Sequence, residues 1–193
     1  MHVVSLYEYI RSKEMTRKNT IWYRGSNRKN PIKFDHDEDF DTNERYGCGL
    51  YFTNNPETAS MYGKVHAYEI PNTGIYSATS KIDILTIRKI LYQKSKEDLE
   101  MFLSDWHEDY LTKPEKAMRI YLDSLLDYND TMGEALISVY VDAFNHQRNE
   151  FYAAAIKAGV NGFITKTDNT SNTKERYLIL YNPAIIKKVF DVE

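Results

Sequence analysis

The feature that most constrains this fold is a change in the spacing of apolar residues along the chain. At both ends, apolar residues form short runs of strand length, at residues 21–23, 50–53, 65–70, 162–165 and 176–181. Between about residues 83 and 158, apolar residues instead recur every three or four positions, the period of an amphipathic helix. This order predicts an α+β fold with an inserted helical subdomain at about 83–158.

Length and composition narrow the class of protein. The 193 residues suit a single domain, 1–193, and a hydrophobic content of 42% is enough for a packed core. A net charge of −3 gives no broad field that would attract nucleic acid. Cys48 is the single cysteine, so an intramolecular disulfide is impossible, and the chain fits a reducing cytoplasm. No apolar run approaches the ~20 residues of a membrane span, so no membrane partner is expected.

Local signals divide the chain further. Residues 6–13 predict a short helix, and the charged stretch 27–46 predicts a surface loop. Pro56 fits the first turn of a helix that runs to residue 61. Pro114 and Gly133 predict breaks between helices in the middle of the chain.

The first candidate binding residues follow the strand at 21–23. Arg24 ends this strand, and its guanidinium can bind pyrophosphate or ribose oxygens with two parallel hydrogen bonds. Gly25 follows, and a glycine allows a ligand to approach the backbone closely. The alternative is an ordinary arginine at a strand end before a turn.

A second candidate segment surrounds the strand at 50–53. Gly47 and Gly49 precede it and would let a ligand approach the backbone. Tyr51 and Phe52 are neighbours on a strand and must point to opposite faces, so one can face a pocket and the other the core. Tyr62 follows one helix later and could supply a second ring for stacking. The alternative is a glycine-rich turn that leads into a core strand.

These segments resemble a known superfamily. Residues 22–26 and 47–62 resemble the poly(ADP-ribose) polymerase-like branch of the ADP-ribosyltransferases, with Gly25-Ser26 and the two tyrosines Tyr51 and Tyr62 at matching positions. Tyr23-Arg24-Gly25 is similar to the first strand of the toxin-like branch. At the C-terminal end, an alanine-rich helix, a Gly-x-x-Gly turn and a strand that ends in Asn-Pro resemble small phage and bacterial toxin domains of this superfamily; they occupy residues 153–158, 159–162 and 177–183.

The resemblance implies a fold and an activity. The fold would be an ADP-ribosyltransferase-like split β-sheet core. The activity would be cleavage of NAD, as a substrate, at the nicotinamide–ribose bond, with transfer of one ADP-ribose to a macromolecular acceptor. The residues implied in catalysis are Arg24, Tyr51, Glu175 and Tyr177. The residues implied in binding NAD are Tyr23, Arg24, Gly25, Ser26, Gly49, Tyr51, Phe52 and Tyr62.

The catalytic acid departs from the family pattern. Counting back from Asn182, the position of the family's glutamate falls on Tyr177. Glu175 lies two residues earlier and shares the face of Tyr177 if the strand extends that far. Glu175 could therefore replace the missing acid. The alternative is a solvated charge beside Lys174 and Arg176.

Three functions stay open on the sequence. The first is a cytoplasmic mono-ADP-ribosyltransferase, such as a phage or bacterial effector that acts in a host cytoplasm. Its acceptor would be a protein rather than a nucleic acid. The second is a non-catalytic module that binds NAD, ADP-ribose or a protein. The third is a toxin that hydrolyses NAD without an acceptor.

The remaining chemistry-bearing residues predict no metal site. The histidines at 36, 66, 107 and 146 lack zinc-site spacing, and one cysteine cannot supply a thiolate cluster. The acidic stretch 35–41 lacks the glycine and the final glutamate of an EF-hand. Cys48 has no evident His-Asn partner and is interpreted as a packing residue. Residues 77–80 are interpreted as a turn with an N-cap for the helix that follows.

Overall fold

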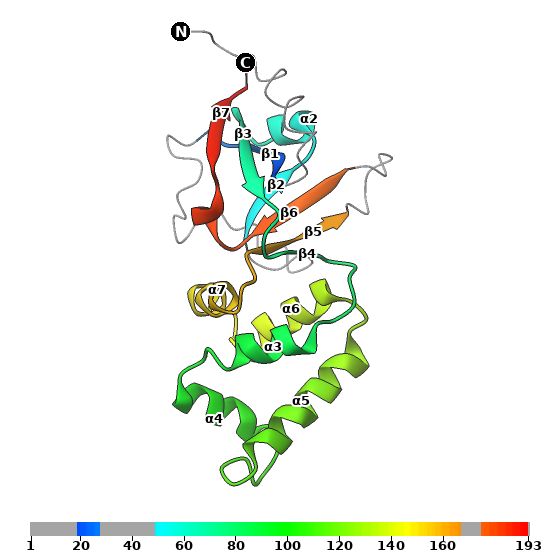
Figure 1. The fold of residues 1–193 in the computed structure, drawn as a ribbon, viewed down its shortest axis with the longest axis vertical. Coiled ribbons are helices and arrows are strands. Elements are labelled where there is room, and N and C mark those ends of the chain that lie inside the picture. Colours follow the sequence, from blue (N-terminus) through cyan, green and yellow to red (C-terminus); the bar gives the residue numbers. More distant parts are fainter. Residues whose placement is uncertain (1–18, 28–48, 167–174, 193) are drawn as a thin grey trace. The chain divides into compact units, whose positions relative to one another are not determined.

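The computed structural model describes residues 19–27, 49–166 and 175–192 (Figure 1). The helix expected at 6–13, nearly all of the loop at 27–46, Gly47 and Cys48 lie outside these residues. The chain forms two compact units. The sheet unit contains the described residues up to 75 and from 161 onward, and the helical unit contains residues 76–160.

The sheet contains every segment that the sequence marks as a strand and two further strands, and only the first residue of β4 lies within the sheet unit. The strands are β1 (Asn19–Gly25), β2 (Leu50–Thr53), β3 (Val65–Pro71), β4 (Ile75–Ser77), β5 (Gly162–Lys166), β6 (Arg176–Leu180) and β7 (Lys188–Asp191), in the order β4-β5-β6-β2-β1-β3-β7. The five predicted strands are confirmed, and the α+β class holds. The sequence analysis missed β4 and β7, because each is too short to show an alternating pattern.

The sheet consists of two groups of strands that meet at one residue pair. β1 pairs antiparallel with β3 along its whole length, and β3 pairs antiparallel with β7. β6 pairs antiparallel with both β2 and β5 (Figure 1). Between the groups, β1 pairs antiparallel with β2, with Tyr23 opposite Thr53. The two groups are therefore joined at Tyr23–Thr53.

Alternation along the strands separates the two faces of the sheet. One face carries the hydrophobic core of this unit, which comprises Trp22, Leu50, Phe52, Tyr68, Ile70, Leu178 and Leu180. The rings of Phe52 and Tyr68 meet edge to face, with 5.1 Å between their centroids. Tyr51 alternates with Phe52 and lies on the opposite face, as the strand period predicts.

A short helix, α2 (Pro56–Ser60), follows β2 and packs on the end of β1. Asn55 caps it by accepting a hydrogen bond from the backbone N–H of Glu57 at 3.0 Å, and Pro56 occupies its first turn as predicted. A Cβ atom on Gly25 would overlap the carbonyl oxygen of Ala59. Glycine is therefore required at position 25 by the backbone of α2.

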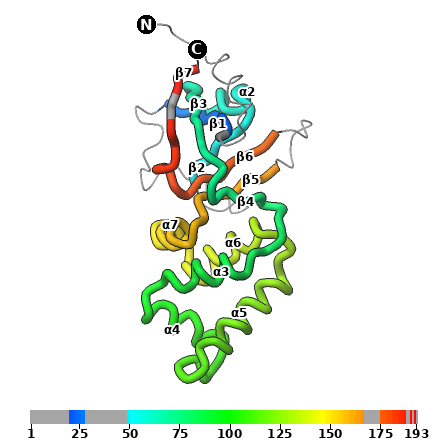
Figure 2. Tube along the Cα trace, in the orientation of Figure 1, coloured from blue at the N-terminus to red at the C-terminus, as the bar shows by residue number. Residues whose placement is uncertain are grey.

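The helical unit contains five helices (Figure 2): α3 (Ile84–Leu91), α4 (Lys96–Ser104), α5 (Pro114–Tyr128), α6 (Met132–Asp142) and α7 (Arg148–Lys157). Pro114 begins α5, as expected for a break. Gly133 does not break a helix: it lies in the first turn of α6, where a Cβ atom would crowd the backbone of Ala78. The break falls before α6, because Thr131 and Glu134 form a capping box there.

The turn expected at 77–80 is present, with the backbone N–H of Ser80 donating to the carbonyl of Ser77 at 3.0 Å, but it does not supply the N-cap of α3. Asp83 itself is the N-cap and accepts hydrogen bonds from the backbone N–H of Thr86 at 3.2 Å and from its hydroxyl at 2.7 Å. These hydrogen bonds lower the pKa of Asp83 below its ordinary value, and the bond from the Thr86 hydroxyl makes the largest contribution. An aspartate at this position starts α3 because it satisfies an unpaired N–H of the first turn.

Candidate functional site

Three polar side chains form a row across the sheet at the junction of its two strand groups. Tyr23 on β1 pairs with Thr53 on β2, and Thr53 pairs with Tyr177 on β6. Register partners in antiparallel strands share a face and lie on strands about 4.8 Å apart. Tyr51, two residues before Thr53, lies on the same face. The structure therefore brings Tyr23, Tyr51 and Tyr177 onto the face opposite the hydrophobic core.

Glu175 joins this row at the start of β6. The backbone N–H of Arg176 donates to Asn54 Oδ1 at 2.8 Å, and that of Asn54 donates to the carbonyl of Arg176 at 3.1 Å. This pairing holds the chain beside β2 at the residue that follows Glu175. Glu175 lies two residues before Tyr177, so extended backbone gives both side chains the same face.

The carboxylate of Glu175 is buried beside the hydroxyl of Thr53. Glu175 is 4% exposed and Thr53 is 3% exposed, and the Thr53 hydroxyl donates to Glu175 Oε1 at 3.4 Å. The backbone N–H of Asn55 donates to the same hydroxyl at 3.0 Å. Because Thr53 has one hydroxyl hydrogen, it accepts from Asn55 and directs that hydrogen to Glu175. The alternative interpretation of Glu175 as a solvated hairpin charge is therefore wrong.

Tyr23, which lies next to Thr53 on the side opposite Tyr177, is also partly buried, and this changes its pKa. Desolvation raises the pKa of the Tyr23 phenol above its ordinary value, because the phenolate is disfavoured away from water. At neutral pH, Tyr23 is a neutral hydrogen-bond donor and acceptor. The row thus combines a buried carboxylate, a hydroxyl that is oriented toward it and half-buried phenol groups.

Arg24 lies on the other face of the sheet. Alternation along β1 gives it the face of Trp22, and its register partner is His66 on β3. Its Nη1 donates to the backbone carbonyl of Tyr51 at 3.0 Å. Arg24 therefore adds a side-chain link between β1 and β2, beside the Tyr23–Thr53 pair that joins these strands. The structure does not bring the guanidinium onto the face of Glu175.

The other predicted NAD-binding residues lie in varied surroundings. Ser26 is buried, and its backbone N–H donates to the carbonyl of Lys64 at 2.9 Å. Gly49 lies against β6, where a Cβ atom would overlap the side chain of Ile179. Phe52 belongs to the core, and Tyr62 follows α2 with 65% of its surface exposed.

Thr53 is the site residue that the sequence analysis did not select. It lies two residues after Tyr51 on the same strand, so alternation alone gives it the face of Tyr51. Its contact with Glu175 depends on the register between β2 and β6, which the sequence does not reveal. The signal in the sequence that marks Thr53 is a polar side chain on the same strand face as Tyr51.

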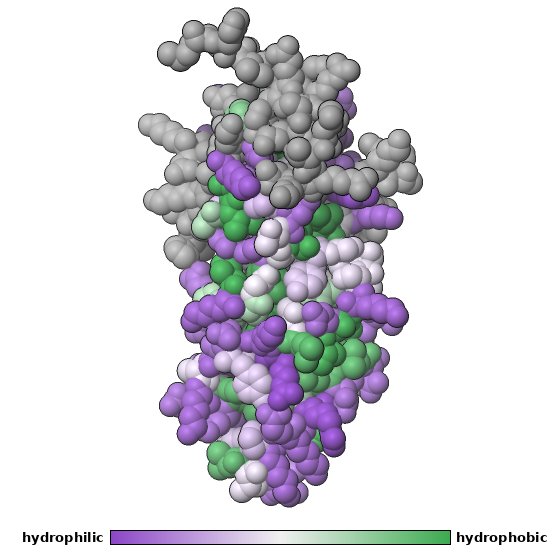
Figure 3. All heavy atoms as spheres, viewed as in Figure 1, coloured by the Kyte–Doolittle hydropathy of each residue, from purple (hydrophilic) through white to green (hydrophobic). Residues whose placement is uncertain are grey.

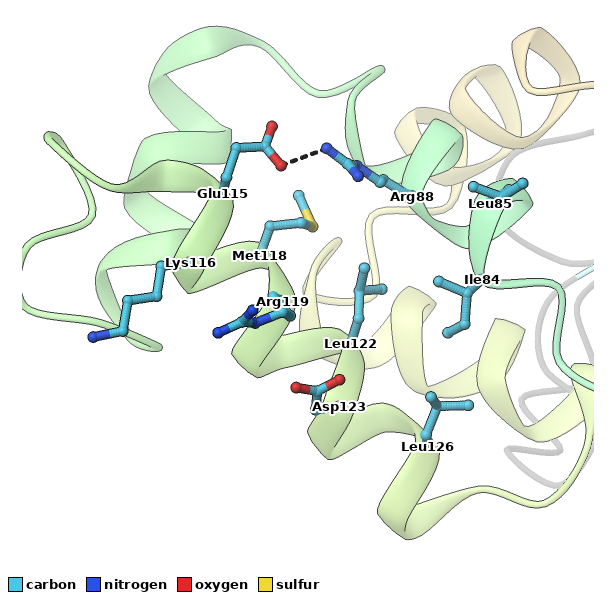
Figure 4. Close-up of a pocket in the computed structure, with 10 residues that line it drawn as sticks. All are labelled: Ile84, Leu85, Arg88, Glu115, Lys116, Met118, Arg119, Leu122, Asp123 and Leu126. Carbon is cyan, nitrogen blue, oxygen red and sulfur yellow. Dashed lines mark hydrogen bonds and ion pairs between the residues drawn. The ribbon is translucent and has the colours of Figure 1, made fainter.

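A separate groove lies in the helical unit, between α3 and α5. It has a volume of about 560 Å³ and is lined by Ile84, Leu85, Arg88, Glu115, Lys116, Met118, Arg119, Leu122, Asp123 and Leu126 (Figure 4). An ion pair between Arg88 and Glu115 spans the two helices at one end. The hydroxyl of Tyr92 also donates to Glu115, at 2.7 Å. The groove contains none of the residues predicted to bind NAD.

Comparisons with known proteins identify no relative. No protein-family profile, curated protein or solved structure matches this chain. In the ranges that the structure describes, no helix is long and apolar enough to cross a membrane. Among those same residues, no group of three or more His, Cys, Asp or Glu side chains could hold a metal ion.

Proposed function

We propose that this chain is a mono-ADP-ribosyltransferase-like enzyme that cleaves NAD at the nicotinamide–ribose bond and transfers ADP-ribose to a macromolecular acceptor. The observation that carries the proposal is the buried carboxylate of Glu175, which receives the Thr53 hydroxyl hydrogen on the face that bears Tyr23, Tyr51 and Tyr177. Burying a carboxylate beside one long hydrogen bond is unfavourable for stability. A chemical role for the carboxylate is a reason to keep it there.

The reaction needs a negative charge beside the ribose. As nicotinamide leaves, positive charge develops at the anomeric carbon, as in glycoside hydrolysis. A carboxylate that is fixed near this carbon stabilises the charge without reorganising during the reaction. In the proposal Glu175 is this carboxylate, and Thr53 is a positioning residue that holds it. The C–N bond breaks with its electron pair going to nicotinamide, a nucleophilic atom of the acceptor forms the new bond to the ribose, and the proton that this atom carried is released to solvent.

The phenol groups around Glu175 have the chemistry to hold the dinucleotide. Tyr51 and Tyr177 are half-buried on the same face as Glu175 and provide flat rings on which a nicotinamide can stack. The phenol of Tyr23 is protonated at neutral pH, and burial raises its pKa further, so it can donate to a ribose or phosphate oxygen. Arg24 supports the site from the opposite face by binding the carbonyl of Tyr51.

The topology also supports the proposal. The two strand groups meet at the Tyr23–Thr53 pair, which fits the split sheet that the sequence resemblance implies. The candidate residues lie at this junction.

Release of nicotinamide from labelled NAD tests the proposal, with and without a bacterial lysate. We expect Glu175→Gln to lower kcat by about 10²–10³-fold, because one preorganised electrostatic contact is worth about 2.7–4 kcal/mol. Thr53→Val keeps the shape but removes the hydroxyl; it should lower kcat with little change in KM. Glu57→Gln on the exposed face of α2 is the matched control and should keep full activity.

The outcomes separate the candidate functions. Lysate-dependent release with label on a macromolecule supports the transferase, and a gain of activity in Tyr177→Glu would confirm the register assigned to the acid. Release without a labelled acceptor supports the NAD hydrolase. Binding of NAD with no release above the Glu175→Gln background supports the non-catalytic module and contradicts the enzyme.

A further inference from the structure

The exposed side of α5 carries a stripe of four charged side chains, in which two positive charges precede two negative ones. Lys116 and Arg119 lie in its first half, and Asp123 and Asp127 lie in its second half. All four are exposed, and their spacing places them along one side of the helix. At 1.5 Å per residue, the centres of the positive and negative halves lie about 11 Å apart along the axis. No ion pair joins any of the four to another residue in the described part of the helical unit.

This order of charges does not stabilise α5 itself, because it is the reverse of the order that the helix dipole favours. The helix dipole favours anions in the first turn and cations in the last turn, but α5 has no basic residue in its last turn and has Asp127 there. The first turn also carries Glu115, but Arg88 neutralises this carboxylate across the groove. The charges that remain therefore oppose the dipole of their own helix.

An apolar surface lies next to the stripe. Leu85 on α3 is 69% exposed and Leu126 on α5 is 46% exposed, and both line the groove above the buried Met118 and Leu122. Figure 3 shows hydrophobic side chains gathered on this face, and Figure 4 shows Lys116, Arg119 and Asp123 following one another along α5. A contiguous exposed apolar patch with a polar rim is typical of an interaction surface.

We propose that this α3–α5 face binds the same face of a second copy of the chain, with the two α5 helices antiparallel about a two-fold axis that crosses the exposed stripe midway between Arg119 and Asp123. This arrangement places Lys116 opposite Asp127 of the second copy and Arg119 opposite Asp123 of the second copy. The two-fold axis repeats both pairs, so all four charges of each copy gain an opposite partner. The same contact covers Leu85 and Leu126 and sets the two helix dipoles antiparallel. Self-complementary charge favours a second copy over an unrelated helix.

Charge reversal tests the proposal on the full chain by light scattering and sedimentation velocity. The wild type should have twice the chain mass of 22.7 kDa at low salt and dissociate as salt rises. Lys116→Glu with Arg119→Glu makes the stripe wholly negative, and Asp123→Lys with Asp127→Lys makes it wholly positive. Each double variant should be monomeric alone because like charges then face each other. An equimolar mixture should recover the dimer, because every facing pair is opposite again.

Controls separate this surface from a general effect of charge. Lys96→Glu with Lys157→Glu gives the same change in net charge on α4 and α7 and should leave the dimer intact. Circular dichroism verifies that each variant keeps its helices. A wild type that stays monomeric at high micromolar concentration overturns the proposal and leaves the groove to a different partner. Dimers that persist in both double variants, or a mixture that stays monomeric, also overturn it.

Discussion

The buried hydroxyl of Tyr121 gives a prediction about stability that can be worked out from its surroundings. Tyr121 on α5 is 1% exposed, and its ring meets Phe102 edge to face with 4.8 Å between centroids and Trp106 with 4.9 Å. Its hydroxyl has no hydrogen-bond partner among the residues that the structure describes. A buried polar group without a partner costs roughly 1–3 kcal/mol. Phenylalanine keeps both ring contacts and removes the hydroxyl.

Tyr121→Phe should therefore stabilise the helical unit. The void left by one oxygen atom costs a few tenths of a kcal/mol at ~24 cal/mol per Å³. The free energy of unfolding should rise by about 1–2 kcal/mol, which raises Tm by roughly 2–8 °C in a chain of this size. The assay is urea and thermal unfolding followed at the helical band of the circular dichroism spectrum. Tyr128→Phe, at an 86% exposed position of the same helix, should change nothing.

Alkaline pH sharpens this test. Burial, together with a smaller contribution from the charge of Asp142, raises the pKa of Tyr121 in the folded chain, whereas the unfolded tyrosine titrates near pH 10. Above that pH the folded state binds one more proton than the unfolded state, so stability falls as pH rises. Wild type should lose about 1.4 kcal/mol per pH unit above 10 relative to Tyr121→Phe. A destabilised Tyr121→Phe, or the same alkaline slope in both proteins, would refute the reasoning.

Three further predictions concern backbone geometry and helix capping. Gly25→Ala should destabilise the sheet unit by about 3 kcal/mol or more, because the new Cβ overlaps a backbone carbonyl that cannot rotate away. Gly159→Ala has open space around its Cβ and should cost only the strain of its positive φ, about 1–2 kcal/mol, in the same urea titration. Thr131→Ala should cost about 1 kcal/mol by removing the capping box of α6, and Thr131→Ser should restore it. Equal unfolding midpoints for the two Thr131 variants would show that the cap contributes nothing.

Local patterns in the sequence were enough to predict most of the elements. The strand at 50–53 matches β2 residue for residue, because glycine and Asn-Pro bound a short apolar run. Pro114 marks the start of α5 because proline fits the first turn of a helix. Gly133 shows where this reasoning fails: the same residue type permits close packing against Ala78 inside a helix instead of ending one.

The candidate site depended on information that no local pattern contains. Alternation predicted that Tyr51 and Phe52 point to opposite faces, and both lie as expected. The register between β2 and β6 decided that Thr53 meets Glu175, because these residues are 122 positions apart in the chain. Burial of that carboxylate is likewise a property of the surrounding strands.

The sequence by itself determined where strands and helices form, because hydrophobic period, caps and turn residues act over a few positions. It also determined the order of charges along α5, since a helix converts sequence spacing directly into position on a face. Only the tertiary structure decided that Arg24 lies on the face away from Glu175, that Gly25 is required by α2, and that the two strand groups join at Tyr23–Thr53. These features arise from pairing between distant strands, where a shift of one residue would reverse every face.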